Sequence, residues 1–428
     1  MEITKPIMLD STGQEIKEAL LSIGGAISGK GRIYGFHIDE SESDVSKKVT
    51  YLKDAVGMTP MAMNYETGVM NYGSWKSVLD DWLMPRPCML KSNGTVYKYL
   101  DENDNTKYAD GTDSDIANLD FDGNAMVEWG KNGKKIWYKV EPGSNNHSAD
   151  VFIADYQADQ NYHAYSFIDK DGNLKDHFYT PMFNGVVNNG KLRSISGLMP
   201  AGGTTAAQEI TYAEANGSGW FTEILSDNTL IEFLLILLGK STDVQTVFGK
   251  GNCNGFVNDA SANYGKIVTG TMNKKGMFWG SDVSSNTETY GVKVFGMENW
   301  WGNIHRRYAG HINDNGVQKI KMTFGTEDGS IANNFNLTGE GYIEAGASPA
   351  KEGFISKMLF TPFTMIPAET LGSSTTHFPD YVWVNNGQVN YALRGGDSGN
   401  GAYCGFVFRL DFLASLAAWY FGACLSYR

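Results

Sequence analysis

Several features that would each define a class of protein are scarce or missing in this sequence. Only four of the 428 residues are cysteines, Cys88, Cys253, Cys404 and Cys424, which is too few for a disulfide scaffold in a chain of this length. Since no two of them form a Cys-x-x-Cys pair, the sequence predicts no structural zinc site. Cys404 and Cys424 could approach each other, but buried free thiols are the favoured interpretation.

Positive charge is scarce as well. The chain has 35 Lys and Arg residues against 48 Asp and Glu residues, which leaves a formal net charge of −13. No basic stripe is present that could release counterions from a nucleic acid, so nucleic acid is excluded as a partner. The same charge balance disfavours binding to an anionic membrane surface.

Long apolar runs are missing too. The longest one, from Phe233 to Leu238, is far too short to span a bilayer, so the sequence predicts no membrane insertion. The first residues, MEITKPIMLD, contain no basic segment followed by an apolar one, and we therefore expect no secretory signal.

The usual motifs of catalysis and metal binding do not occur. There is no His-Glu-x-x-His pair, no Gly-x-Ser-x-Gly elbow, no Walker loop and no dinucleotide-binding glycine pattern. His305 and His311 flank a loop and resemble a ligand pair, but a core or surface role is favoured. The acidic loop at residues 101–115 lacks the Gly and Glu positions of an EF-hand, which favours a solvated loop. We expect no metal, no cofactor and no enzymatic activity.

The length predicts two or three domains, because one hydrophobic core seldom serves 428 residues. A capping-box pattern and an apolar face predict a helix at residues 11–24, so residues 1–30 are assigned to attachment or oligomerisation. Residues 31–119 are predicted to form a β-rich intermediate region. Residues 120–428 are predicted to form the large C-terminal domain.

Three local patterns give definite predictions of secondary structure. Residues 32–39 alternate between apolar and polar types as a strand does. Residues 125–140 predict a hairpin that turns at residues 131–133, where the sequence is Lys-Asn-Gly. Residues 221–241 have the strongest helical pattern, with Asp227 placed to cap the helix and Gly239 placed to end it. A helix with apolar residues on more than one face belongs in a core.

The most unusual absence is local and concerns residues 391–428. The last lysine of the chain is Lys357, the last methionine is Met365, the last glutamate is Glu369 and the last glutamine is Gln388. Beyond them, polar positions carry only Asp, Asn, Ser, Tyr, Arg and Gly. Either a restriction on coding or a short buried segment that lacks long polar side chains by chance would explain this narrow set of residue types.

Two further patterns narrow the interpretation. The segment Met297-Glu298-Asn299-Trp300-Trp301-Gly302-Asn303 is followed by Leu393-Arg394-Gly395-Gly396 and by an ending Gly-Ala-Cys-Leu-Ser-Tyr. Together they resemble the formylglycine-generating-enzyme-like branch of the C-type lectin fold. Within that branch they are similar to the variable proteins of diversity-generating retroelements carried by phage tails. The resemblance covers about residues 30–428. It implies an α+β protein with a C-type lectin-like C-terminal domain and a smaller β-rich N-terminal region.

In that family a reverse transcriptase rewrites adenines in a template copy. Asn codons then yield Asp, Ser, Gly, Tyr, Phe, Leu, Arg and Ala, but not Lys, Glu, Gln, Met or Trp. The resemblance therefore accounts for the residue types that residues 391–428 lack, and it implies a displayed, variable set of residues. The set is Asp397, Gly399, Asn400, Tyr403, Phe406, Phe408, Asp411, Phe412, Leu413, Leu416, Ala418, Tyr420 and Phe421. A core role stays open for some of them, Phe406 and Phe421 especially.

The resemblance also implies a fixed scaffold. Its members are Trp300, Trp301, Gly302, Asn303, Arg394, Gly395, Gly396 and Trp419. Arg394 and the two glycines after it would turn the chain into the displayed surface, and the Trp-Trp-Gly-Asn loop would lie beneath that turn. Trp419 cannot arise from the adenine changes, so it is assigned to the scaffold.

The implied function is that of a non-enzymatic receptor-binding protein. The expected partner is a host cell-surface protein or glycan, and the expected location is a phage tail or the surface of a prophage-bearing bacterium. A homo-oligomer is expected, with a trimer favoured. Glu141-Pro142 is followed by Gly143, which departs from the Glu-Pro-Asn calcium motif of sugar-binding C-type lectins. The resemblance therefore does not extend to calcium-dependent sugar binding.

Two alternatives stay open. One is an enzyme, either a formylglycine-generating-like oxidase or a tail-tip glycosidase whose paired carboxylates meet only in space. The other is a plain structural tail protein with a buried C-terminal stretch. Burial of Tyr403, Phe408, Phe412 and Tyr420 together would favour the structural protein over the displayed surface.

Overall fold

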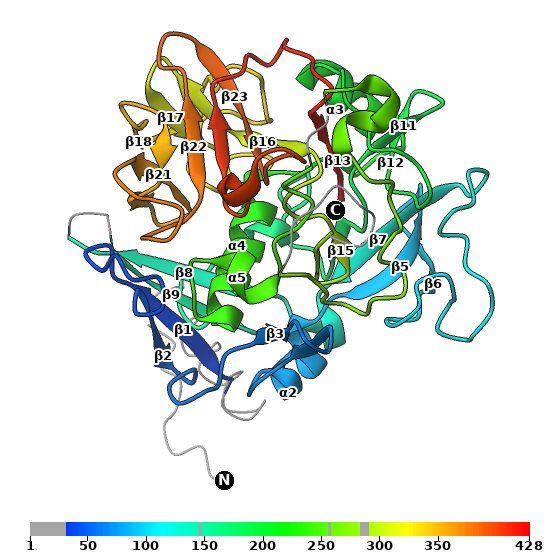
Figure 1. Ribbon diagram of the computed structural model, residues 1–428, viewed down its shortest axis with the longest axis horizontal. Coiled ribbons are helices and arrows are strands. Elements are labelled where there is room, and N and C mark those ends of the chain that lie inside the picture. The colour runs from blue at the N-terminus through cyan, green and yellow to red at the C-terminus, as the bar shows by residue number, and fades with distance from the viewer. Residues whose placement is uncertain (1–30, 145–147, 256–257, 283–290) are drawn as a thin grey trace, which may run out of the picture.

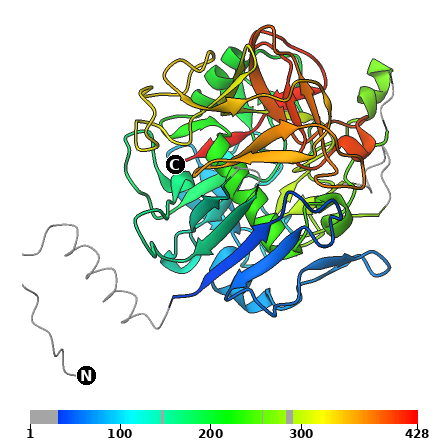
Figure 2. The same cartoon turned by 90° about the vertical axis from the view of Figure 1, so that its left-hand side faces the viewer.

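The structure is a computed structural model that describes residues 31–144, 148–255, 258–282 and 291–428. It is a mixed, sheet-rich protein with 13% helix and 32% strand, which confirms the predicted α+β class at this level. The helix predicted at residues 11–24 lies outside the described residues. Figures 1 and 2 show the N-terminal sheet at one end of the molecule, and the orange and red C-terminal strands at the other.

The first sheet has four antiparallel strands in the order β2-β1-β9-β8. Its strands are β1 (Ile33–Ile38), β2 (Val49–Lys53), β8 (Trp137–Pro142) and β9 (Ala149–Ala154). The strand predicted from residue 32 onward is therefore confirmed as β1. One face of β1 is covered by α4 (Leu225–Gly239), since Phe36 packs edge-on against Phe233 with ring centroids 6.2 Å apart.

The second sheet has six antiparallel strands in the order β13-β26-β10-β7-β5-β6. Its strands are β5 (Arg86–Lys91), β6 (Val96–Tyr99), β7 (Gly123–Trp129), β10 (Phe178–Pro181), β13 (Trp220–Thr222) and β26 (Leu425–Tyr427). β26 comes from the end of the described chain, and it lies between β13 and β10.

The third sheet follows the order β18-β17-β16-β23-β24-β22-β19, with β25 beside β16. Its strands are β16 (His305–Asp314), β17 (Val317–Ile320), β18 (Ile343–Ala347), β19 (Gly353–Phe354), β22 (Tyr381–Val384), β23 (Val389–Arg394), β24 (Phe408–Leu410) and β25 (Phe421–Ala423). β22 and β24 run parallel, as do β16 and β25. Residues 391–428 thus enter two different sheets.

Short hairpins and helical turns connect the three sheets. The hairpins are β3 (Ala62–Asn64) with β4 (Val69–Asn71), β11 (Val186–Asn188) with β12 (Lys191–Arg193), β14 (Lys293–Val294) with β15 (Met297–Glu298), and β20 (Lys357–Phe360) with β21 (Met365–Glu369). The helices and turns besides α4 are α2 (Lys76–Val78), η1 (Leu79–Leu83), η2 (Lys131–Gly133), η3 (Tyr165–Phe167), α3 (Ala206–Glu214), α5 (Val244–Phe248), η4 (Ala260–Gly265) and η5 (Gly401–Tyr403).

The predicted hairpin at residues 125–140 is wrong. Both strands exist, but β7 pairs with β5 and β10, whereas β8 pairs with β9 in the N-terminal sheet. β7 has a neighbour on each side, so no free edge remains for β8. The connection turns through Gly130 at φ +104° and Asn132 at φ +56°, and it carries the chain from one sheet to the other.

The predicted division at residues 119 and 120 is also wrong. β5 lies before that boundary and pairs along its whole length with β7, which lies after it, and β1 pairs in the same way with β9. One hydrophobic core collects buried side chains from Tyr34 through to Leu410. Strand pairing and core packing therefore join the two predicted parts.

Helix α4 lies at the centre of the molecule, where its fifteen residues are all buried. The helix predicted at residues 221–241 is thereby confirmed, and Gly239 is its last residue, followed by Lys240 in the left-handed region. Asp227 does not cap it, because the N-cap position is Ile224 and Asp227 lies in the first turn. Among the described residues, no helix has the length and apolar character needed to cross a membrane.

Candidate binding surface

Both ends of the stretch 391–428 are fixed to the central helix by buried ion pairs. The guanidinium of Arg394 pairs with Glu232 and lies over the ring of Phe408, 4.2 Å from its centroid. The guanidinium of Arg428 donates to Asp227 at 2.5 Å, and the Ser426 hydroxyl donates to the same carboxylate. Burial raises the pKa of Asp227, whereas the charge of Arg428 lowers it. Losing either partner would leave a buried charge without compensation.

The turn at Arg394-Gly395-Gly396 lies directly on the Trp-Trp-Gly-Asn loop, as the resemblance implied. The Gly302 backbone N–H donates to the Gly395 carbonyl at 2.8 Å. A Cβ atom at Gly395, where φ is +90°, would stand 3.0 Å from the Trp300 carbonyl oxygen, so a side chain would be strained and crowded there. Trp300 and Trp301 are both buried. The turn and the loop are therefore in direct contact.

Asn303 fixes the far side of that loop. Its side-chain oxygen accepts from the Ile267 backbone N–H at 2.8 Å and from the Asn252 amide at 3.1 Å, and its amide donates to the Asn184 oxygen at 3.1 Å. The residue is fully buried at φ +68°, a left-handed conformation that asparagine tolerates better than most residues. Asn303 therefore ties several separate segments together beneath the turn.

The loop from Asp411 to Tyr420 is held in a different way, through its backbone. Every second carbonyl oxygen accepts a hydrogen bond from a donor outside the loop. The pairs are Tyr391 N–H with Phe412 at 2.8 Å, Ala206 N–H with Ala414 at 2.9 Å, Arg307 Nη2 with Leu416 at 2.8 Å, Gly203 N–H with Ala418 at 2.8 Å and His305 N–H with Tyr420 at 2.9 Å. None of these bonds uses a side chain of the loop, so they do not depend on which residue types the loop carries.

Arg307 combines this anchoring with side-chain packing. Its guanidinium pairs with Glu209 of α3 at 2.6 Å and lies over the ring of Phe421, 4.7 Å from the centroid. Both ionic groups are almost fully buried. The loop is therefore hydrogen-bonded through the Leu416 carbonyl to Arg307. The position of Arg307 is fixed in turn by Glu209 of α3 and by Phe421 of β25.

The predicted displayed residues divide into three groups by their exposure. Gly399, Tyr403, Leu413 and Leu416 are exposed. Asn400, Asp411, Phe412, Ala418 and Tyr420 are half-buried. Asp397, Phe406, Phe408 and Phe421 are buried, so their assignment to a displayed surface is wrong. Of the four aromatics whose joint burial would favour a plain structural role, only Phe408 is buried.

Strand geometry explains the error at Phe408 and identifies a residue that the sequence prediction missed. Phe408 and Leu410 in β24 point into the core, so the residue between them must point outward. That residue is Arg409, which was not predicted to belong to the surface. The sequence did contain a pattern that indicates this arrangement. Phe406, Phe408 and Leu410 are apolar at every second position, as expected for a strand with one buried face, and this places Arg409 on the other face.

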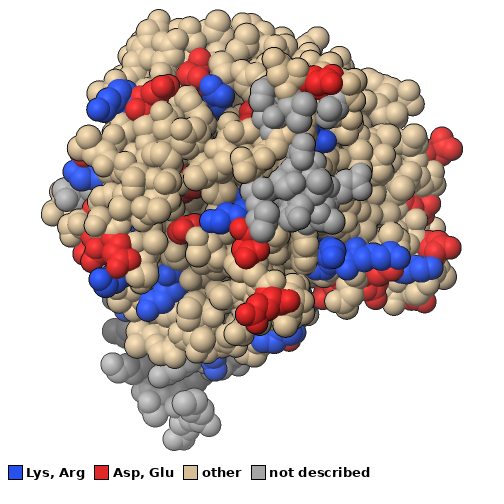
Figure 3. Space-filling view, viewed as in Figure 1, with Lys and Arg blue, Asp and Glu red and all other residues tan. Residues whose placement is uncertain are grey.

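Arg409 lies between aromatic rings. Its guanidinium is 4.5 Å from the centroid of Trp383 and 4.3 Å from that of Phe412, within the range of cation–π attraction. Two hydrogen bonds hold it to the Asp411 carboxylate, at 3.1 and 2.8 Å. Phe412 in turn contacts Tyr420, with centroids 6.0 Å apart. In the space-filling view, acidic and basic side chains lie among uncharged ones in the region of β22 and β23 (Figure 3).

Trp419 packs at the edge of this surface. Its ring stacks on Tyr264, with centroids 4.1 Å apart and planes 17° apart, and it meets Tyr420 edge-on at 5.2 Å. A Cβ atom at Gly202 would stand 2.4 Å from the Trp419 carbonyl oxygen. The backbone at Gly202 therefore passes very close to the backbone at Trp419. These contacts agree with the scaffold role expected for Trp419.

Two buried histidines lie beneath this surface. His305 is fully buried, and its Nε2 is 3.9 Å from the Asp397 carboxylate. Burial and, to a lesser degree, the charge of Arg409 lower the pKa of His305 well below its ordinary value, so the ring is neutral. His311 is buried as well, hydrogen-bonded to Tyr308 and Gln318. Both histidines therefore lie in the core, which is one of the two roles that the sequence left open for them.

All four cysteines are buried thiols that take part in no disulfide, as predicted. Cys404 does not approach Cys424. Its neighbour is Cys253, and burial together with that thiol raises the pKa of Cys404 well above its ordinary value. A protonated, buried thiol is a poor nucleophile. Within the described part of the chain, no three His, Cys, Asp or Glu side chains are grouped so that they could hold a metal ion.

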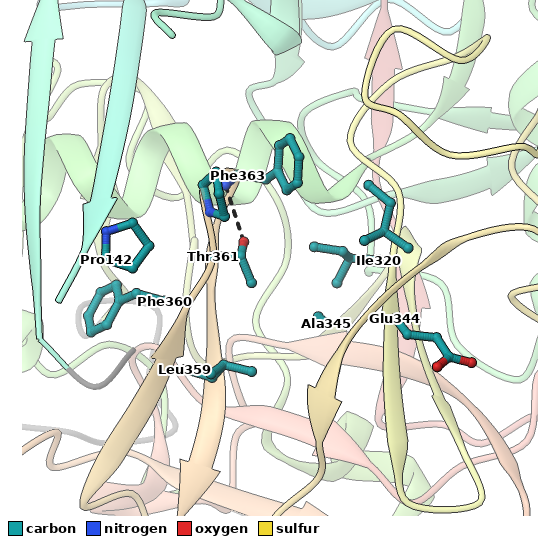
Figure 4. A pocket seen from close by; sticks show the side chains of 10 residues that line it. Pro142, Ile320, Glu344, Ala345, Leu359, Phe360, Thr361 and Phe363 are labelled. Carbon is teal, nitrogen blue, oxygen red and sulfur yellow. Dashed lines mark hydrogen bonds between the residues drawn. The ribbon is translucent and has the colours of Figure 1, made fainter. Parts of the chain in front are cut away.

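A separate hollow of about 410 Å³ opens between Pro142 at the end of β8, β18 and the β20–β21 hairpin (Figure 4). Its walls are mainly apolar, with Leu359 and Phe363 among them. The Thr361 hydroxyl accepts hydrogen bonds from the backbone N–H groups of Phe363 and Thr364, so its oxygen already has partners within the hairpin. The hollow offers apolar contact, and it includes no residue of the stretch 391–428.

No protein-family model matches this chain, and no curated protein matches it either.

Proposed function

We propose that this chain is a non-enzymatic receptor-binding protein that presents a changeable surface on a fixed frame, as the variable proteins of diversity-generating retroelements do in phage tails. The observation that carries the proposal is the anchoring of residues 411–420 through alternate backbone carbonyls. A surface held in this way tolerates replacement of its side chains without loss of its shape. The absence of Lys, Glu, Gln and Met from residues 391–428 supports the same proposal, because restricted coding produces such a set.

A C-type lectin-like arrangement of the C-terminal part belongs to the proposal. It is supported by the resemblance of the two glycine-containing patterns and by the direct contact between Gly302 and Gly395. The receptor would be a host cell-surface protein or glycan, met by a phage tail or by the surface of a prophage-bearing bacterium. Several copies, a trimer in the favoured case, would strengthen weak single contacts through avidity.

The exposed members of the surface suit binding rather than chemistry. Tyr403 is 38% exposed and is accompanied by Leu413 at 42% and Leu416 at 38%. Tyrosine offers a large and rigid contact area at low entropic cost, and clustered apolar side chains at a surface mark interaction sites. The protonated Cys404 thiol and the neutral His305 beneath them supply no activated nucleophile or base.

Sequencing the same locus in several isolates tests the proposal. Substitutions should concentrate at the exposed and half-buried positions of residues 399–420, and they should spare the anchors Arg307, Arg394 and Arg428. A template copy of the stretch and a reverse transcriptase gene should lie nearby. Substitutions spread evenly over buried and exposed positions, or a locus without a template copy, would overturn it.

A further inference from the structure

Four aromatic rings beside the loop 411–420 form one connected cluster. Tyr381 lies 4.4 Å from Tyr403, 4.6 Å from Trp383 and 5.3 Å from Phe354, measured between ring centroids. Phe354 and Tyr403 are also in contact, at 5.2 Å. The rings come from β19, β22 and η5, and only Tyr403 belongs to the stretch 391–428. We call these four residues the aromatic cluster.

The aromatic cluster is accessible and has unused hydrogen-bond donors. Tyr403 is exposed, and Phe354, Tyr381 and Trp383 are half-buried. Among the described residues, the hydroxyls of Tyr381 and Tyr403 and the indole N–H of Trp383 have no hydrogen-bond partner. Burial raises the pKa of Tyr381, so its hydroxyl keeps the proton that it would donate.

Arg409 joins this cluster to the loop. Its guanidinium lies between Trp383 on one side and Phe412 on the other, and Asp411 holds it with two hydrogen bonds. The positive charge of Arg409 and the negative charge of Asp411 therefore cancel. Fixed and changeable residues together present a continuous aromatic surface that has no net charge at its centre.

We propose that Phe354, Tyr381 and Trp383 form a constant half of the receptor-binding surface, and that its partner is a protein that presents a neutral, apolar loop with free backbone carbonyls. The inference rests on the proposed function and names the class of partner. Tyr, Trp and Arg are the residue types that dominate binding energy in protein interfaces. The cancelled charge fits a neutral partner, and the three unused donors fit backbone carbonyl oxygens.

A glycan fits this surface less well. The planar polar groups that would take pairs of sugar hydroxyls, Arg409 and Asp411, are already bound to each other. The ring of Tyr381 is met by tilted or edge-on neighbours, Phe354, Trp383 and Tyr403, which restrict the face that it could offer to a sugar ring. The observations therefore favour a protein.

A display library tests the inference with lysozyme as a model protein. The full chain is displayed with Tyr403, Phe412, Leu413, Leu416 and Tyr420 randomised, and clones that bind lysozyme are selected. In each of several unrelated clones, Trp383→Ala and Tyr381→Ala are then introduced singly. We expect the Kd for lysozyme to rise at least tenfold in most clones, whatever residues the clone carries at the randomised positions.

The matched control is Tyr97→Ala. Tyr97 is an aromatic residue of β6 that is 45% exposed, and Figure 1 shows β6 on the opposite side of the molecule from β22. This variant should keep the Kd within twofold. Tyr381→Phe keeps the ring and removes only the hydroxyl donor. Trp383→Phe keeps a smaller aromatic ring and removes the indole N–H, so both variants should lose less affinity than the alanine variants. Thermal unfolding shows whether each alanine variant folds. If one does not, the corresponding phenylalanine variant is used to test the contribution of that residue to binding.

The possible outcomes separate the two proposals. Clones that bind lysozyme and lose no affinity with Trp383→Ala or Tyr381→Ala would refute the proposal that Phe354, Tyr381 and Trp383 are a constant part of the binding surface. They would not contradict the proposed function. A library that yields no lysozyme clones but yields clones against immobilised dextran would overturn the protein partner. A library that yields no clones on either probe would overturn the proposed function, and the constant half with it.

Discussion

Residues 411–420 and residues 421–428 follow one another in the chain, yet the protein holds them by different means. The first segment is bound through alternate backbone carbonyls, and its side chains are exposed or half-buried. The second is bound through the backbone pairing of β25 and β26 with their neighbouring strands and, in addition, through its side chains. Phe421 and Leu425 are fully buried, and Arg428 pairs with Asp227 at the start of the central helix. The difference teaches that tolerance to substitution depends on which part of a residue makes its contacts.

Arg428→Leu is the strongest test of the claim that side chains hold residues 421–428 in place. The substitution leaves the Asp227 carboxylate buried without its partner, and breaking a buried pair in this way costs about 3 to 5 kcal/mol. Urea unfolding followed by circular dichroism measures the change. In the double variant Asp227→Leu with Arg428→Leu the uncompensated charge is gone, so most of the lost stability should return. A double variant no more stable than the single one would show that the ion pair is not what fixes this end.

Two adjacent residues give the next largest contrast. Phe421→Ala removes a fully buried ring and should lower the free energy of unfolding by about 3 kcal/mol, the lower end for such changes. The lower end is expected because Phe412 and Tyr420, both half-buried neighbours, can move into part of the space.

Tyr420→Ala is the matched control. Since Tyr420 is half-buried and its backbone carbonyl still accepts from His305, the variant should lose about 1 kcal/mol. Equal losses from the two variants, measured in the same urea titration, would break the distinction between the segments.

A third segment, residues 397–406, packs against a buried carboxyl of the frame. Asp380 lies against Gly405, and burial, with the Asp243 carboxylate second, raises the pKa of Asp380 well above its ordinary value. The folded protein therefore binds this proton more tightly than the unfolded chain does. Stability from this group is full below its ordinary pKa, about 3.9, and falls as the pH rises toward the folded value.

Asp380→Asn checks that pH dependence, because it keeps the shape of the side chain and removes the charge. We expect the variant to be more stable than the parent protein at pH 8 and equal to it at pH 4, by thermal unfolding. Val382→Ala, a change at a buried apolar neighbour in β22, should instead lower stability equally at both pH values. A difference between Asp380→Asn and the parent that does not vary with pH would refute the assignment.

The smallest effects are expected at the exposed side chains of the loop. Leu413→Ser and Leu416→Ser should each change the free energy of unfolding by no more than about 0.5 kcal/mol, because their carbonyls, rather than their side chains, are in contact with the frame. Differential scanning calorimetry of each variant and of the pair together checks this. A loss of several kcal/mol from the pair would mean that the loop depends on its side chains after all.

Local patterns predicted individual elements well and their partners poorly. The run of apolar residues from 233 to 238 predicted a core helix, because a helix with apolar residues on more than one face has to be surrounded. The strands at residues 125–129 and 137–140 were predicted as elements, but not that they join different sheets. The first of these strands, β7, pairs with β5, which lies far before it in the sequence, and the second, β8, pairs with β9, which follows it after a turn. The hairpin prediction failed because it paired each strand with the nearest strand in the sequence.

The candidate surface shows the same limit at the level of single residues. The missing residue types located the stretch 391–428, and the two glycine patterns located the turn and the loop beneath it. Phe408 was predicted on the wrong face, and Arg409 was missed, because the boundaries of β24 were not apparent from the sequence. The buried pairs of Glu232 with Arg394 and of Asp227 with Arg428 gave no local signal, since each joins residues that are far apart in the chain.

The sequence by itself determined the residue types available to the terminal stretch, the apolar character of the central helix, and the two glycines that let the chain pass over Trp300. These follow from composition, period and allowed backbone angles, which are properties of neighbouring residues. Only the tertiary structure decided which of those aromatics face the solvent. Hydrogen bonds from Gly203, Ala206, Tyr391 and β16 position the backbone of residues 411–420. The direction of each side chain depends on that path, because burial is settled by what packs against a residue, not by its type.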